Sequence, residues 1–283
     1  MARIAIIGGG SIGEALLSGL LRAGRQVKDL VVAEKNPDRA KQLADTYSVL
    51  VTSVADAAEN ATYIIVAVKP ADVEPVTAEI AEAVAKADGE SEEQVFVSVA
   101  AGVSTAFYEA KLPAGAPVVR VMPNAPMVVG GGVSALAAGR FATPEQLKEV
   151  SAIFDTVGEV LTVAEKQLDA VTAVSGSGPA YFFLMVEALV DAGVDAGLSR
   201  EVATDLVVHT MAGSAAMLLD RRDGTPPGVM DTSPAALRAI VTSPGGTTAA
   251  GLRELERGGL RSAVSDAIAA AKKRSEQLGI TSE

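Results

Sequence analysis

The chain contains no cysteine, no tryptophan and a single histidine among its 283 residues. Without cysteine it cannot form disulfides, use a thiol nucleophile or bind a metal through sulfur. The lone histidine, His209, lies in the middle of an expected helix, so we expect a structural or surface role for it. We expect no transition-metal site, because cysteine is missing and histidine, the other favoured ligand, occurs only once.

Positive charge is also scarce. Lys and Arg number 24 against 35 Asp and Glu, which gives a net charge of −11 and argues against a nucleic-acid partner. No uninterrupted apolar run approaches the ~20 residues of a membrane span, and the first residues lack the pattern of an export signal. We therefore expect no membrane association and a cytoplasmic location, which the absence of cysteine also fits.

What the chain has in abundance is small aliphatic side chains. Residues of the hydrophobic class make up 49% of the chain, although aromatics supply only 4%. This composition suits helices packed closely on a sheet or on each other, and it argues against disorder. The length suffices for one large domain or two ordinary ones.

The first part of the chain alternates short β-branched runs with longer Ala-rich helical segments. Most runs are continuously apolar, as in strands of a parallel sheet that is covered on both faces. We therefore predict a doubly wound, mostly parallel α/β sheet over residues 1–164. The expected strands are Arg3–Ile7, Leu30–Ala33, Val49–Val51, Tyr63–Val68, Val95–Val99, Pro117–Val121, Val133–Leu136 and Glu159–Val163.

The second part, residues 165–283, shows helical periodicity and no strand signal, so we predict an all-α domain there. Ser199 is an expected N-cap, and we expect loops at Ala87–Gln94 and Asp220–Pro234. The helices expected at Ala180–Ala196 and Val202–Leu219 are apolar around much of their circumference. One small helical domain cannot easily bury that surface, so we predict at least a homodimer formed through it.

The strongest local motif opens the chain. A G-x-G-x-x-G sequence directly follows the first strand and begins a helix, which is the pattern of a Rossmann-type dinucleotide site. Its first glycine permits a tight turn, its second lets the backbone approach a pyrophosphate, and its third allows close helix–strand packing. The helix N-terminus supplies amide donors for the phosphates. The expected cofactor-binding residues are Gly8, Gly9, Gly10, Ser11, Ile12 and Gly13.

The second strand ends at Glu34, near the spacing expected for the acid that binds the adenosine ribose. A carboxylate there favours NADH because it repels a 2′-phosphate. However, Lys35, Asn36 and Arg39 follow at once and could hold that phosphate. The sequence therefore leaves the choice between NAD(H) and NADP(H) open.

Further strands also end in small or polar residues, which would line a cofactor cleft because ligands bind at the carboxyl ends of parallel strands. The Ala100-Ala101-Gly102 tip is small enough for a flat ring to rest on its backbone, and Met122-Pro123-Asn124 follows another strand. The remaining tip consists of Ala67, Val68, Lys69 and Pro70.

Two glycine-rich elements interrupt the helical part. Ser175–Pro179 is expected to precede a helix, with Pro179 in its first turn. The second element precedes another helix, and its amides and hydroxyls offer an anion site for a substrate carboxylate. It comprises Ser243, Pro244, Gly245, Gly246, Thr247 and Thr248.

Taken together, these motifs resemble those of the pyrroline-5-carboxylate reductases from Arg3 to Gln277. The most specific parts are Asp169–Tyr181, Asp191–Arg200 and Val241–Thr248. The resemblance implies reduction of Δ1-pyrroline-5-carboxylate to L-proline with NADPH or NADH, the last step of proline biosynthesis. It also implies dimers intertwined through the helical domain, which can associate into rings of dimers.

Carried over by motif, the resemblance implies that Gly8–Gly13 and Ala67–Pro70 contact the dinucleotide, with Ala100–Gly102 near the nicotinamide. Ser243–Thr248 would hold the substrate carboxylate, and Thr248 would be the catalytic residue beside the ring nitrogen. Three positions depart from the family pattern: Val54, where some relatives have asparagine near the adenine, Ala125 and His209.

Two alternatives belong to other classes. A β-hydroxyacid dehydrogenase also joins a Rossmann domain to a helical one, but it relies on a lysine in the first long helix of the second domain. The expected helix Pro179–Val190 contains no lysine. A non-catalytic dinucleotide sensor could share the fold, but it would not require the second glycine–threonine loop.

Overall fold

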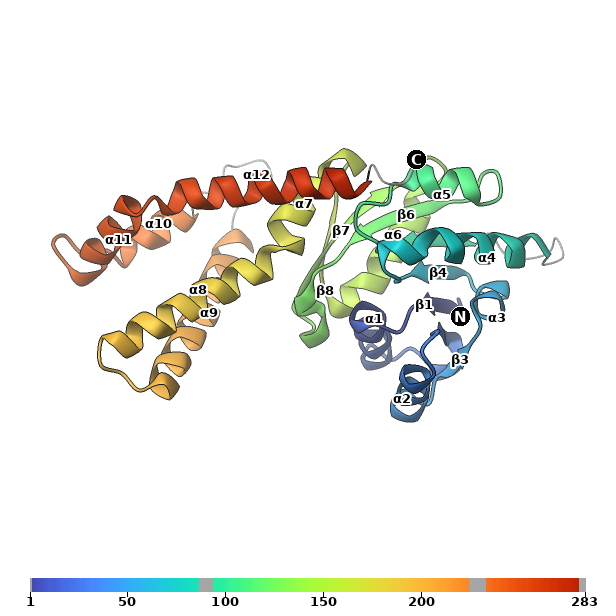
Figure 1. Cartoon of the computed structure of the whole chain (residues 1–283), viewed down its shortest axis with the longest axis horizontal. Coiled ribbons are helices and arrows are strands. Elements are labelled where there is room, and N and C mark those ends of the chain that lie inside the picture. Colours follow the sequence, from blue (N-terminus) through green and yellow to red (C-terminus); the bar gives the residue numbers. More distant parts are fainter. Residues whose placement is uncertain (1, 87–93, 224–232, 280–283) are drawn as a thin grey trace. The chain divides into compact units, whose positions relative to one another are not determined.

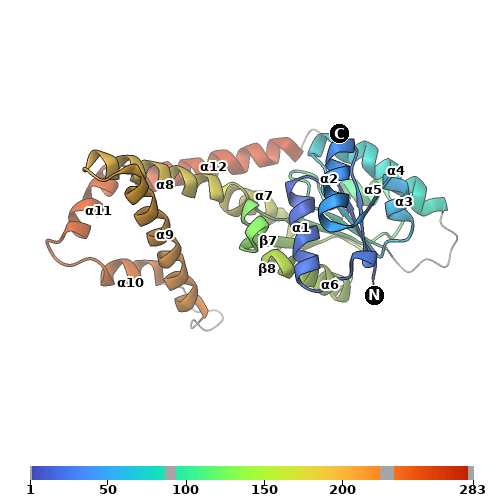
Figure 2. The same cartoon turned by 90° about the horizontal axis from the view of Figure 1, so that it is seen from below.

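The structure, a computed structural model, describes residues 2–86, 94–223 and 233–279. The chain forms two compact units (Figure 1 and Figure 2). Unit 1 comprises Met1–Pro179 and Ile268–Glu283, and unit 2 comprises Ala180–Ala267. Helices α8 (Gly178–Asp195) and α12 (Leu260–Gly279) each pass from one unit into the other.

Unit 1 is built on a single sheet in the order β3-β2-β1-β4-β5-β6-β7-β8, with helices on both faces (Figure 1). Neighbouring strands are parallel except β6 and β7. This confirms the predicted doubly wound, mostly parallel sheet. The strands are β1 (Ile4–Ile7), β2 (Leu30–Ala33), β3 (Leu50–Thr52), β4 (Tyr63–Val66), β5 (Val95–Ser98), β6 (Val118–Met122), β7 (Gly132–Ala138) and β8 (Gly158–Thr162).

The antiparallel pair follows from a short connection. β6 and β7 are joined by a turn that contains the 3-10 helix η3 (Ala125–Val129) and Gly130, which has φ +76°. A parallel crossover needs about a dozen residues or more, and this connection is shorter. The chain therefore returns beside β6 in the opposite direction.

The sheet separates two hydrophobic cores, and consecutive residues of one strand serve both. Ile4 and Ile6 of β1 face one core, whereas Ala5 and Ile7 face the other, and all four are at most 1% exposed. Because both faces are covered, these strands read as continuous apolar runs. The helices on the two faces are α1 (Ser11–Arg22), α2 (Pro37–Tyr47), α6 (Pro144–Phe154), α3 (Val54–Glu59), α4 (Val73–Lys86) and α5 (Thr105–Lys111).

Several helices of unit 1 begin at residues whose side chains cap them. Asn36 accepts the backbone N–H groups of Asp38 and Arg39 at the start of α2, and Thr143 forms a capping box with Gln146 at the start of α6. The short helix α3 was not predicted, because its six residues are too few for an apolar period to show. Its N-cap, Ser53, was the available signal.

Unit 2, in its described part, contains α9 (Arg200–Asp223), α10 (Ser233–Ile240), α11 (Thr247–Arg257) and the adjoining portions of α8 and α12. The predicted all-helical character is confirmed. Ser199 accepts the Val202 N–H at 3.3 Å, as an N-cap does. The predicted loop at Asp220–Pro234 is wrong at its edges, because Asp220–Asp223 continue α9 and Ser233 begins α10.

Residues 224–232 of that loop, and 87–93 of the loop predicted at Ala87–Gln94, lie outside the described residues. The predicted domain boundary after residue 164 also differs from the division into units. Leu168 of α7 (Leu168–Val171) is fully buried against Ala135 and Ala137 of β7, so the first helical residues pack with the sheet. The boundary at 164 stays a prediction.

Most of the large apolar side chains that are exposed in this chain belong to unit 2. Phe182, Phe183 and Leu184 are each more than 60% exposed. By length and composition alone, two helical stretches, Glu165–Asp195 and Arg200–Arg221, are apolar enough to cross a membrane. Charged residues such as Glu187 and Asp205 divide these stretches, so neither is an uninterrupted apolar run. Further exposed apolar residues are Leu189, Val202, Leu206, Val208, Met217, Leu219, Ile240, Val241 and Val264.

Candidate active site

A cleft of about 610 Å³ lies at the carboxyl ends of β1, β2, β3 and β4. β1 stands between β2 and β4, so the order of strands reverses there. Open α/β sheets bind ligands at such a switch point, and the volume is typical of a cofactor site. The lining residues are Ile7, Gly8, Gly10, Ala33, Glu34, Lys35, Thr52, Ser53, Val54, Ala67, Val68, Lys69, Asp72, Pro75, Val76 and Glu79.

Three glycines shape the loop between β1 and α1. Gly8 has φ +109°, and a Cβ there would lie 2.7 Å from the carbonyl oxygen of Ala67. A Cβ on Gly13 would overlap the Gly8 carbonyl oxygen, so the helix can approach the turn only because the side chain is absent. Gly10, the N-cap of α1, has open space around its Cβ position. Each glycine therefore meets the requirement that the motif predicts for it.

The open space at Gly10 is where a pyrophosphate fits. The amides of the first turn of α1 begin there, and Gly10 has no side chain to keep a phosphate away. The residues present thus suit a dinucleotide, with the pyrophosphate at the start of α1 and the adenosine toward the ends of β2 and β3. Val54, which departs from the family pattern, lines the cleft.

The acidic residue at the end of β2 is tied to the glycine loop. One oxygen of Glu34 accepts the N–H of Gly9 at 2.8 Å, and the other accepts the N–H of Asn36 at 2.8 Å. Arg39 donates to the Gly9 carbonyl oxygen at 2.8 Å and to Glu14 at 2.6 Å. These contacts hold Gly9 from both sides and fix the loop before any ligand binds.

The residues that could hold a 2′-phosphate are therefore fewer than the sequence suggests. Asn36 is occupied as the cap of α2 and Arg39 is bound to the glycine loop. Lys35 forms an exposed ion pair with Asp72 at 2.9 Å and lines the cleft together with Lys69. A carboxylate suited to a free ribose and lysines suited to a phosphate share one cleft, which fits the use of NAD(H) or NADP(H).

The other predicted cofactor residues fall into two groups. Ala67, Val68 and Lys69 line the cleft beside Gly8. The remaining predicted residues do not line it: they are Gly9, Ser11, Ile12, Gly13, Asn36, Pro70, Ala100, Ala101 and Gly102. The last three follow β5, the next strand beyond β4 at the same edge of the sheet.

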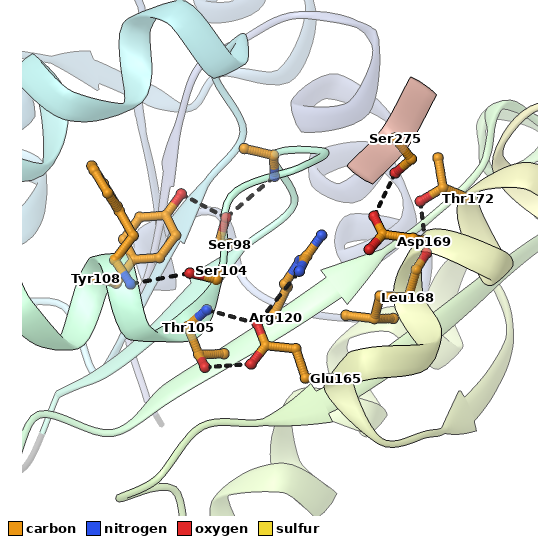
Figure 3. A network of polar contacts seen from close by, with 12 residues as sticks. Ser98, Ser104, Thr105, Tyr108, Arg120, Glu165, Leu168, Asp169, Thr172 and Ser275 are labelled. Carbon is orange, nitrogen blue, oxygen red and sulfur yellow. Dashed lines mark hydrogen bonds and ion pairs between the residues drawn. The ribbon is translucent and has the colours of Figure 1, made fainter. Parts of the chain in front are cut away.

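A network of buried and half-buried polar groups lies at the two ends of the loop that carries Ala100–Gly102 (Figure 3). Ser98 and Arg120 are neighbours across β5 and β6. The Ser98 hydroxyl lies 2.7 Å from the Tyr108 hydroxyl, and the Glu165 carboxylate accepts two hydrogen bonds from Thr105. This network was not predicted from the sequence. Its one visible signal was Arg120, a charged residue inside the apolar run of a buried strand, which requires a partner.

Burial raises the pKa of the Tyr108 phenol to about 12, although the hydrogen bond with Ser98 and the charge of Arg120 oppose that rise. The phenol therefore stays protonated at neutral pH. It can support its neighbours by hydrogen bonding, but it does not exchange a proton in that range.

The predicted substrate loop lies in unit 2. Gly245 has φ +69°, and the Gly246 N–H donates to the Ser243 carbonyl oxygen at 3.0 Å, which closes a tight turn before α11. Gly246 is the N-cap of α11, and Ser243, Gly245, Thr247 and Thr248 are exposed. The first amides of the helix and the Thr248 hydroxyl are thus accessible to a ligand.

The other glycine-rich element is not a loop. Thr172–Gly176 form a π-helical turn that leads into α8, in which the Ser177 N–H donates to the Thr172 carbonyl oxygen. Asn124 supports this turn by donating to the Ser175 carbonyl oxygen at 3.1 Å. The prediction that Ser175–Pro179 precedes a helix with Pro179 in its first turn is confirmed, because α8 begins at Gly178. The glycine-rich element is itself largely helical, however, since a wider helical turn accommodates Gly176. His209 is exposed within α9. Among the described residues, no group of three or more His, Cys, Asp or Glu side chains is placed to hold a metal ion.

A glycine-loop α/β unit with a cleft at its switch point, continued by a helical region, defines a class: the dinucleotide-dependent dehydrogenases and reductases. Two family models match the chain, "NADP oxidoreductase coenzyme F420-dependent" over residues 3–102 and "Pyrroline-5-carboxylate reductase dimerisation" over residues 165–278. The chain is 71% identical to the pyrroline-5-carboxylate reductase of Mycobacterium tuberculosis, an alignment that covers 100% of this chain and 99% of that one. The chain belongs to the pyrroline-5-carboxylate reductase family.

Solved structures agree. A pyrroline-5-carboxylate reductase from Coxiella burnetii superposes with a TM-score of 0.87 at 32% identity, covering 98% of both chains. The Plasmodium falciparum enzyme, solved with NADP bound, superposes with a TM-score of 0.83 at 28% identity, also over 98% of both chains. The predicted family, fold class and NAD(P)H cofactor are thereby confirmed, whereas the individual site residues stay predictions.

The glycine loop yields a testable contrast. Gly10→Ala should fold normally, since its Cβ meets no atom, yet weaken dinucleotide binding about tenfold or more because the methyl group occupies the phosphate position. Gly13→Ala should instead lower the melting temperature, because its Cβ overlaps the Gly8 carbonyl oxygen. Gly131→Ala, in an exposed turn, is the control. Cofactor titration and thermal unfolding measure both effects, and equal affinity of Gly10→Ala and wild type would contradict the assignment.

The buried phenol yields a second prediction. Because the folded-state pKa of Tyr108 lies above its unfolded value, the stability it contributes is complete below about pH 10 and is lost as pH rises toward 12. Tyr108→Phe should remove that part of the alkaline decline, at most about 1.4 kcal/mol per pH unit. Ser98→Ala, which keeps the phenol, should retain it. Parallel unfolding curves of wild type and Tyr108→Phe between pH 9 and 11 would refute the assignment.

Proposed function

We propose that this chain is a pyrroline-5-carboxylate reductase: it transfers a hydride from NAD(P)H to the C=N bond of Δ1-pyrroline-5-carboxylate and forms L-proline. The observation that carries the proposal is the pairing, in one chain of this family, of the cleft at Gly8 and Gly10 with the Ser243–Thr248 turn. We further propose that the protein works in the cytoplasm.

The chemistry asks little of ionisable side chains. When bound, the reduced nicotinamide supplies the hydride that the C=N carbon accepts. The reaction is easiest when the imine nitrogen is already protonated, so the protein's main tasks are to orient two ligands and exclude water. Small residues suit this role, and Ala100–Gly102 offer a flat backbone surface for the nicotinamide ring.

The Ser243–Thr248 turn has the properties of a carboxylate site. The amides at the start of α11 are available because its N-cap, Gly246, has no side chain to occupy them. An anion there is favoured by the helix dipole. We propose that these amides bind the substrate carboxylate and that the Thr248 hydroxyl orients the ring nitrogen.

Purified protein should oxidise NADPH or NADH only when Δ1-pyrroline-5-carboxylate is added, and L-proline should accumulate. Folded protein without turnover with either cofactor would overturn the proposal. Cofactor binding with no turnover of any imine would favour a sensor, and activity on 3-hydroxyisobutyrate instead would favour a β-hydroxyacid dehydrogenase.

Thr248→Ala tests the role of the hydroxyl. Losing one neutral hydrogen bond costs about 0.5–1.5 kcal/mol, so kcat/KM for the imine should fall roughly threefold to tenfold. Cofactor affinity and melting temperature should hardly change, since Gly246 rather than Thr248 caps α11. Thr248→Ser keeps the hydroxyl and is the matched control. A loss on the order of 10²–10⁴-fold would instead make Thr248 a proton donor, and reduced stability with intact kinetics would make it structural.

The exposed apolar helices point to self-association, and the matching dimerisation model covers them. We propose a homodimer that buries Phe182, Phe183 and Leu184, since water-exposed side chains of this size cost about 1.5–3 kcal/mol each relative to burial. This assigns the apolar surfaces of α8 and α9 to a second copy of the chain rather than to a membrane. Rings of dimers would appear as larger even multiples.

Light scattering of the wild type at micromolar concentration should give at least twice the 28.7 kDa of one chain. Phe183→Asp should reduce that mass, because a buried unpaired carboxylate is costly. Leu50→Asp makes the same kind of change at an exposed apolar position of β3 and should leave the mass unaltered. A monomeric wild type would refute the dimer.

A further inference from the structure

The loop that joins β5 to α5 carries Ala100–Gly102, and its first end is fixed by buried hydrogen bonds. The Ser98 hydroxyl lies 2.7 Å from the Tyr108 hydroxyl and accepts the N–H of Ala100 at 3.3 Å. Ser98 is 1% exposed and Tyr108 is 2% exposed. Ser98 thus connects the first residue of the Ala100–Gly102 segment to Tyr108 of α5.

The far end of the loop is fixed by a residue from a distant part of the sequence. The two carboxylate oxygens of Glu165 accept the N–H and the hydroxyl of Thr105, each at 2.7 Å. Arg120 of β6 approaches the same carboxylate at 3.4 Å. Figure 3 shows Thr105 and Arg120 directed toward Glu165 from α5 and β6. A carboxylate that accepts two short hydrogen bonds from one residue holds Thr105 in one orientation.

The partners of Glu165 are buried, so losing the contact would be costly to the folded protein. Thr105 is 5% exposed, and the Arg120 side chain is 7% exposed. Removing the negative charge would leave the Arg120 guanidinium buried without its ion-pair partner, and such a loss costs far more than breaking a surface pair.

The middle of the loop packs against the end of α12. Gly102 has φ +80°, and a Cβ there would lie 3.2 Å from the backbone N of Gly279. The end of α12 is itself held by the Ser275 hydroxyl, which donates to Asp169 at 2.6 Å. Glu165 and Asp169 are four residues apart at the start of the helical segment, so one short stretch holds both the loop and the helix that covers it (Figure 3).

We propose that Glu165 is a positioning residue for hydride transfer: acting through Thr105, it fixes the Ala100–Gly102 backbone on which the nicotinamide ring rests. The inference depends on the proposed function, which assigns that loop to the nicotinamide. Glu165 itself touches no substrate atom in this role. The cleft at Gly8, Gly10 and Glu34 lies at other strand ends, so Glu165 governs ring orientation and not dinucleotide affinity.

Glu165→Gln is the direct test. It preserves size and one acceptor but removes the charge. We expect kcat with Δ1-pyrroline-5-carboxylate to fall about tenfold, while the dinucleotide Kd stays within about twofold of wild type. Reduced cofactor deuterated at C4 should show a larger isotope effect on kcat in the variant, since hydride transfer becomes more rate-limiting. A purely structural role would lower the melting temperature without this split.

Thr105→Ala is a milder variant for the case that Glu165→Gln folds poorly. It removes the hydroxyl contact but keeps the hydrogen bond from the Thr105 backbone N–H to Glu165. The two changes should be non-additive in kcat, as expected of residues acting through one contact, and Thr105→Ser should restore activity. Glu74→Gln breaks the exposed Lys111–Glu74 ion pair of α5 and should match wild type. If the wild type is active and both Glu165→Gln and Thr105→Ala have the same kcat as the wild type, this inference is overturned and the proposed function is not. A wild type without imine turnover would overturn the proposed function, and this inference with it.

Discussion

The close approach of α1 to the first turn of the sheet is the constraint on which the rest of the cofactor site depends. Gly13 lies so near the Gly8 carbonyl that no side chain fits between them, and Gly8 itself adopts a positive φ against Ala67 of the neighbouring strand end. This contact places the N-terminus of α1 over the switch point between β1 and β4. Glu34 and Arg39 then hold Gly9 in place, so the amides proposed to bind the phosphates are arranged before a ligand arrives. Preorganisation of this kind lowers the cost of binding.

The same edge of the sheet is built differently for the two ends of a dinucleotide. Around β1 to β4, backbone and charged side chains line an open cleft suited to phosphates and ribose. Beyond β4, the loop after β5 is small and apolar at its surface, and its polar support lies behind it in Ser98, Tyr108, Thr105 and Glu165. This division suits the chemistry, because a hydride donor needs a fixed ring more than it needs a titrating neighbour.

Much of this could be predicted from the sequence. The continuous apolar runs predicted the covered parallel strands, and the glycine spacing predicted the turn at α1, because both patterns follow from local geometry. What could not be predicted depends on contacts between distant residues. Nothing local in Glu165 shows that it reaches Thr105, 60 residues away. Likewise, the sequence of Ser175–Pro179 predicts a break between two helices, and only the structure shows the π-helical turn, supported by Asn124, that continues the helix up to Gly176.

The central claim is that one chain binds a dinucleotide across this edge, with the pyrophosphate at the start of α1 and the nicotinamide on the loop after β5. A crystal structure of the protein with NADPH tests it most directly. The account predicts phosphate oxygens within hydrogen-bond distance of the first amides of α1 and the nicotinamide ring against Ala100–Gly102. A pyrophosphate bound elsewhere, or a nicotinamide ring remote from that loop, would contradict it.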